Sequence, residues 1–147
     1  MTRNLCIAVI ASVSLSAQDG RLLLIFAALP VGLGLSQTND CDTLEKCQEA
    51  LKTQLHSSLT HFRMGEIYLS QRSYTNAANE FRESLNGDLE PRWTEVWDHV
   101  DLGKIFDSTN QRQRALNEYR LAIGTKDNTR GALDEARKYT ETPYRPD

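Results

Sequence analysis

Two carboxylates flank one histidine: Asp98 precedes His99, and Asp101 follows two residues later. These residue types could do general acid–base chemistry or hold a metal ion, and they would support a hydrolase. His61, however, stands in a matching stretch of sequence and has neither carboxylate beside it. We therefore favour a packing role and predict no catalytic residue, no metal site and no cofactor. A hydrolase using His99 with Asp98 or Asp101 is kept as a third hypothesis.

The charge balance excludes one class of partner. The 147 residues include 17 Lys and Arg against 20 Asp and Glu, a net charge of −3, with no basic block. Phosphate backbones need clustered cations, so we predict no nucleic-acid partner. Glu80 and Glu118 recur in matching stretches, and a solvated helix face explains them better than paired catalytic carboxylates.

Two cysteines, Cys41 and Cys47, lie six residues apart. Along one helix this spacing is a rise of about 9 Å, which is beyond the reach of a disulfide. Asp42 and Glu45 fit a capping box that would start a helix at Thr43 and leave Cys41 outside it, free to fold back. Two alternatives stay open: a Cys41–Cys47 disulfide, or a buried Cys47 with a free Cys41.

The first 36 residues hold two apolar runs, 5–17 and 22–35, each shorter than the ~20 residues that cross a bilayer. Short apolar runs that follow an arginine are typical of secretory signals, and Ser36 suits a cleavage site. We expect residues 1–36 to be a signal peptide or an apolar targeting segment. The chain would then be exported, periplasmic or secreted; the alternative is an uncleaved membrane anchor.

Residues 37–147 form the expected folded domain, and an internal repeat organises it. The stretch 61–68 matches 99–106 in its His, apolar, Gly, Ile and aromatic positions, an offset of 38 residues. The same offset relates 77–82 to 115–120. One offset shared by two helical segments predicts that a pair of helices is used twice. The expected segments are a half repeat at 42–54, repeats at 58–87 and 92–124, and a capping helix at 129–141.

Small residues occupy matched places in the two repeats. Gly65 and Gly103 fall in mid-helix, where glycine is up to ~1 kcal/mol less favourable than alanine, and this predicts close helix packing. Gly87 and Gly124 are expected to end helices in the left-handed conformation. Ala77 and Ala115 are the small residues expected opposite the mid-helix glycines. Phe81 and Tyr119 are the rings expected between the units.

These residues resemble the tetratricopeptide repeat, whose period is 34 residues. The first unit has Met64-Gly65, Tyr68, Ala77, Phe81 and Ser84, and the second has Leu102-Gly103, Phe106, Ala115, Tyr119 and Ala122. The chain departs from the pattern in its longer offset and in His61 and His99, which replace an aromatic residue. The resemblance, which is to small exported bacterial members, implies an all-α fold: a short solenoid of antiparallel helix pairs with a C-terminal capping helix.

The resemblance also implies that the first helix of each pair lines a concave binding face. The residues it places there are Leu59, Phe62, Glu66, Leu69, Trp97, Val100, Lys104 and Asp107. Trp97, with Trp93 one turn earlier, is the best anchor for a partner, unless both rings only seal the neighbouring helix.

The leading functional hypothesis is a non-catalytic adaptor of the cell envelope that binds a protein or peptide partner. The alternative is a structural accessory subunit of a larger complex or homo-oligomer. Contact with a membrane is expected only through an uncleaved N-terminal segment.

Overall fold

The structure, a computed structural model, describes residues 41–146, so the expected signal peptide at 1–36 lies outside the described residues. The described part is helical, without a strand. Its elements are α1 (Leu44–Leu51), α2 (Ser58–Ser70), α3 (Tyr74–Leu85), α4 (Trp93–Ser108), α5 (Arg112–Thr125), a 3-10 turn η1 (Thr129–Gly131) and α6 (Ala132–Glu141). None of these helices is long and apolar enough to cross a membrane. The predicted all-α class is confirmed.

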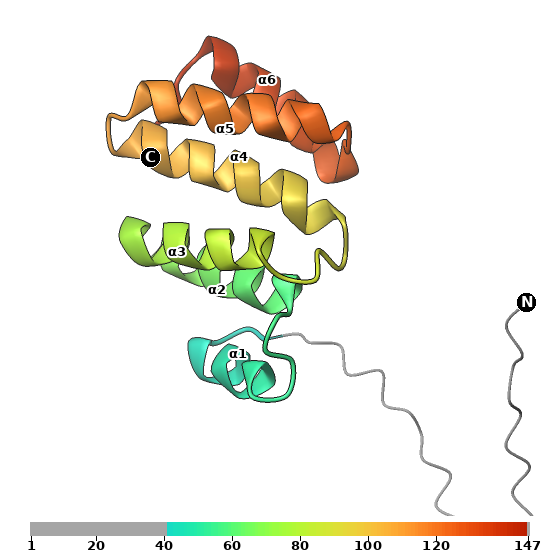
Figure 1. The fold of residues 1–147 in the computed structure, drawn as a ribbon. Coiled ribbons are helices and arrows are strands. Elements are labelled where there is room, and N and C mark those ends of the chain that lie inside the picture. Colours follow the sequence, from blue (N-terminus) through green and yellow to red (C-terminus); the bar gives the residue numbers. More distant parts are fainter. Residues whose placement is uncertain (1–40, 147) are drawn as a thin grey trace, which may run out of the picture. The chain divides into compact units, whose positions relative to one another are not determined.

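Two antiparallel hairpins form the centre of the described chain. Helix α2 packs against α3, and α4 packs against α5, while α3 also contacts α4 and so joins the two hairpins. Helix α1 covers α2 at one end, and α6 packs on α5 and α4 at the other (Figure 1). This order of packing is that of a short helical solenoid, in which each unit leans on the next.

The turn inside each hairpin is built in the same way. Arg72 and Asn110, which are 38 residues apart, both adopt the left-handed conformation, with φ of 57° and 58°. The residue after each donates its backbone N–H back across the turn: Ser73 to the Tyr68 carbonyl at 2.9 Å, and Gln111 to the Phe106 carbonyl at 2.7 Å. These bonds satisfy carbonyl groups that a helix end leaves without a partner.

The predicted glycine stops are wrong. Gly124 lies inside α5, and the left-handed residue after that helix is Lys126, with φ of 60°. Gly87 does not adopt a left-handed φ either. A Cβ at Gly87 would lie 2.5 Å from Ser58 Oγ and 2.6 Å from the His56 carbonyl oxygen. Glycine is therefore needed there because the loop after α3 presses against the start of α2.

The mid-helix glycines accept aromatic rings of their own hairpin. A Cβ at Gly65 would lie 2.5 Å from Cε1 of Phe81, and a Cβ at Gly103 would meet the same ring carbon of Tyr119. Both rings are fully buried. The expected close packing at the two glycines is confirmed. The groups that pack there are the Phe81 and Tyr119 rings, however, and not Ala77 and Ala115 as expected.

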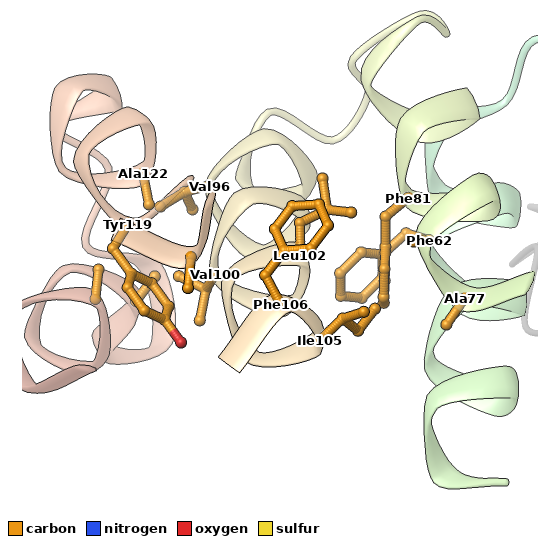
Figure 2. Close-up of a cluster of buried hydrophobic side chains, with 14 of the residues drawn as sticks. Phe62, Ala77, Phe81, Val96, Val100, Leu102, Ile105, Phe106, Tyr119 and Ala122 are labelled. Carbon is orange, nitrogen blue, oxygen red and sulfur yellow. The ribbon is translucent and has the colours of Figure 1, made fainter. Parts of the chain in front are cut away.

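The core lies between the two hairpins and under the last helix. Figure 2 shows Phe62 and Phe81 of the first hairpin facing side chains of α4, while Tyr119 of α5 lies near Val100. The centroids of the Phe62 and Phe81 rings are 5.7 Å apart. Burial of aromatic side chains dominates the energetics of such cores, and here it couples the two repeats.

Helix α1 belongs to a separate, smaller cluster. The sulfur atoms of Cys41 and Cys47 are joined in a disulfide, with Cα atoms 4.8 Å apart, and both residues are buried against Met64. The helix begins one residue later than expected. Thr43, rather than Asp42, is its N-cap, and its hydroxyl accepts from the Lys46 backbone N–H at 3.3 Å.

Candidate functional site

Helices α2 and α4 line two neighbouring hollows that share Glu66 and Asp101. The larger has a volume of about 490 Å³, and its lining residues are Glu66, Leu69, Ser70, Arg72, Tyr74, Asp101, Tyr144 and Pro146. The smaller has a volume of about 360 Å³, and its lining residues are Phe62, Glu66, Trp93, Trp97, Asp101, Lys104 and Arg130. We refer to the two hollows together as the α2–α4 groove.

The groove brings together five of the eight residues expected on the concave face: Phe62, Glu66, Leu69, Trp97 and Lys104. The other three do not line it. Val100 and Asp107 are buried, and Leu59 is half-buried at the start of α2. The hollows thus lie along the helices on which the binding face was expected, but Val100 and Asp107 point into the interior and are not part of the surface.

Both tryptophans are held in place by neighbouring groups. The Trp93 ring stands edge-on to Phe62, with centroids 5.2 Å apart, and the Arg130 guanidinium lies 4.6 Å from the Trp93 ring centre. The Trp97 indole N–H donates to the Thr129 carbonyl at 3.1 Å. The two rings therefore do seal neighbouring elements, and they also form one wall of the smaller hollow.

Lys104 is the electrostatic centre of the groove. Its ammonium lies 3.0 Å from an Asp101 carboxylate oxygen and 2.9 Å from a Glu135 carboxylate oxygen, so it links α4 to α6. Burial disfavours its charge, but the two carboxylates outweigh burial and raise the pKa of Lys104. Burial also raises the pKa of Asp101 to about 6, although Lys104 opposes this shift. Lys104 is thus a fixed cation rather than a free binding group.

Asp107 anchors the C-terminal part of the domain. Its carboxylate accepts hydrogen bonds from the Tyr119 hydroxyl at 3.0 Å and from the Tyr144 backbone N–H at 2.9 Å, and it pairs with Arg112 at 2.9 Å. Arg112 donates in turn to the Tyr139 carbonyl at the end of α6. A carboxylate with this many partners has a structural role.

The candidate hydrolase site of His99 with Asp98 or Asp101 is not formed. The Nδ1 atom of His99 lies 2.8 Å from a Glu118 carboxylate oxygen, and His61 meets Glu80 in the same way at the same distance. Asp98 instead forms a hydrogen bond of 2.6 Å with the Ser84 hydroxyl in the interior. The interpretation of Glu80 and Glu118 as a solvated face is wrong, because each is about one-fifth exposed and pairs with its histidine.

Residues 41–146 contain no group of three His, Cys, Asp or Glu side chains that could hold a metal ion. Sequence reasoning missed six residues that line the groove. Three of them, Ser70, Arg72 and Tyr74, lie at the turn between α2 and α3. The others lie at its C-terminal edge: Arg130, Tyr144 and Pro146. The repeat pattern ends before them, and the prolines at 143 and 146 indicated only the end of a helix.

Comparison with known proteins finds distant relatives. The chain is 28% identical over 102 residues to the nuclear autoantigenic sperm protein of Homo sapiens, and 26% identical over 102 residues to that of Bos taurus. It is 24% identical over 90 residues to the histone-binding protein N1/N2 of Xenopus laevis. These matches cover 65%, 65% and 57% of this chain but only 13–15% of the relatives. No family model matches the chain, and no solved structure matches it significantly.

These relatives contradict the expected export of the chain. The human and bovine proteins are named for the nucleus, a compartment inside the cell, whereas the apolar N-terminal runs predicted a periplasmic or secreted protein. The resemblance to exported bacterial repeat proteins is corrected in the same way, because the matched relatives come from vertebrates.

Proposed function

We propose that this chain is a non-catalytic protein-binding module that holds a segment of a partner protein in the α2–α4 groove. The observation that carries the proposal is the pair of adjoining hollows between the first helices of the two hairpins. Their walls combine aromatic rings with carboxylates, and such mixed surfaces suit protein partners, in which rings act as anchors and charges set the register.

The partner class we propose is a histone. One relative is named as a histone-binding protein, and its match to this chain spans 90 residues. Charge also supports the choice: Glu66 and Asp101 lie where the two hollows meet, and histones are rich in arginine and lysine. Asp101 stays paired with Lys104, whereas Glu66 is more exposed and meets Arg63 at 2.7 Å, so a basic side chain of the partner would add a charge-assisted hydrogen bond to Glu66.

Binding of purified core histones to the chain tests the proposal. We expect Glu66→Ala to weaken the affinity, measured by calorimetry, by about 10-fold, because truncation removes a carboxylate from the centre of the groove. The matched control is Glu83→Ala, an exposed glutamate of α3 outside the groove, which should bind like the wild type. Equal affinity of both variants would exclude the groove as the site, and no binding by the wild type would exclude histones.

An accessory subunit or homo-oligomer stays an alternative prediction. It is favoured if the mass of the chain in solution exceeds that of a monomer and its melting temperature rises with protein concentration.

A further inference from the structure

We propose that the C-terminal segment 142–146 is a displaceable wall of the α2–α4 groove, which a partner segment has to push aside. The role as a competitor rests on the proposed function of the groove. The docking of the segment rests on contacts that the structure shows, and it can be tested without any partner.

The segment leaves α6 as an extended chain. Thr142 has φ of −124° and ψ of 121°, and Pro143 and Pro146 bracket Tyr144. Proline restricts φ and lacks a backbone N–H, so this stretch cannot continue the helix. Peptides that are already extended lose little entropy on docking, which is why proline-rich segments are frequent groove ligands.

Tyr144 docks the segment at three points. Its backbone N–H donates to the buried Asp107 carboxylate at 2.9 Å. Its ring stands edge-on to Tyr139, with centroids 5.2 Å apart, and the Lys104 ammonium lies 5.9 Å from its centre. A backbone hydrogen bond combined with a seated ring is the way in which peptide ligands are held.

The docked segment lies at the place where a partner would bind. Tyr144 and Pro146 form part of the wall of the larger hollow, whose other walls include Glu66, Leu69 and Asp101. Tyr144 is half-buried, whereas Arg145 and Pro146 are exposed. Since the segment is attached directly to α6, it competes at a high effective concentration with any ligand that would take the place of Tyr144.

The test uses a fluorescein-labelled synthetic peptide of residues 140–147 as the probe, with full-length chains. We expect the peptide to bind the Tyr144→Ala chain at least 10-fold more tightly than the wild type, because the resident segment no longer fills its site. The control is Arg145→Ala, which changes the exposed neighbour and should behave like the wild type. Equal binding to all three chains, or no binding to a helical Tyr144→Ala chain, overturns the proposal.

A second measurement needs no variant. In the wild type, the Tyr144 amide should be protected from hydrogen exchange by its bond to Asp107, and excess peptide should remove that protection. An amide that exchanges freely in the absence of peptide overturns the proposal. Neither assay contains histones, so exchange of the segment can succeed while histone binding fails, and the reverse can also occur.

Discussion

The hydroxyl oxygen of Ser84 lies 2.6 Å from a carboxylate oxygen of Asp98, and both side chains are fully buried where the first hairpin meets α4. The same hydroxyl lies 2.9 Å from the Ser58 carbonyl oxygen, which can only accept. Because a hydroxyl has one proton, Ser84 donates to Ser58, and Asp98 supplies the proton of the shorter bond. Burial raises the pKa of Asp98 to about 9, which agrees with a neutral Asp98.

The buried acid predicts a specific pH dependence of stability. With a folded pKa near 9 and an unfolded pKa near 4, the folded state holds one more proton between these values, so stability falls as pH rises from about 4 to about 9. Asp98→Asn keeps a donor for Ser84 and removes the titration. At pH 8 we expect this variant to be more stable than the wild type. Each kcal/mol of additional stability should raise its melting temperature by about 4–8 °C.

Thermal unfolding followed by circular dichroism across pH 4–9 checks this prediction. The difference between Asp98→Asn and the wild type should shrink toward pH 4. The exposed Asp134→Asn variant should show no such trend. Parallel curves for the wild type and Asp98→Asn would show that Asp98 is ionised in the folded state.

The glycine–ring contacts predict that alanine destabilises the fold at Gly65 and Gly103, although alanine has the higher helix propensity. Gly65→Ala should gain up to ~1 kcal/mol of helix propensity but lose about 1–3 kcal/mol through the clash with Phe81, a net destabilisation. Gly103→Ala should behave in the same way against Tyr119. Gly124→Ala, inside α5 with nothing within 4 Å, should be stabilised instead. Urea unfolding gives the three free energies, and stabilisation of all three variants would contradict the packing described.

The repeated histidine–glutamate bonds predict equal coupling in the two hairpins. Double-mutant cycles with alanine at His61 and Glu80, and at His99 and Glu118, should each give about 1 kcal/mol, because both bonds are 2.8 Å long and largely shielded. The exposed Lys52 and Glu49 pair is the control, with a coupling energy below about 0.5 kcal/mol. Unequal coupling energies in the two hairpins would show that the equivalent bonds do not contribute equally to stability.

Removing the charge of Lys104 is expected to lower the free energy of unfolding strongly. Lys104→Met keeps the apolar stem but leaves Asp101 and Glu135 without their cation, and we expect a loss of about 3 kcal/mol in the free energy of unfolding. A second substitution, Asp101→Asn, should recover part of the loss. Lys52→Met, at an exposed pair, should change stability by less than about 1 kcal/mol. Urea unfolding measures all three, and a loss that Asp101→Asn deepens would contradict this interpretation.

Several features of the fold follow from local spacing. The 38-residue offset, the mid-helix glycines and the aromatic residues sixteen positions after them are enough to predict two helical hairpins in close contact. This works because helix periodicity and the steric cost of a side chain at a crowded backbone are properties of short segments. The expectation of a binding face on the first helices came instead from the resemblance to the tetratricopeptide repeat.

The composition of the groove and of the core was decided only by tertiary packing. Whether Val100 and Asp107 face a partner or the interior depends on how α4 is rotated against α5 and α6, which spacing along α4 does not specify. The histidine–glutamate pairs join residues 19 positions apart, and Tyr144 reaches Asp107 across 37. Such contacts depend on distances between helices, and these distances exist only once the helices have packed.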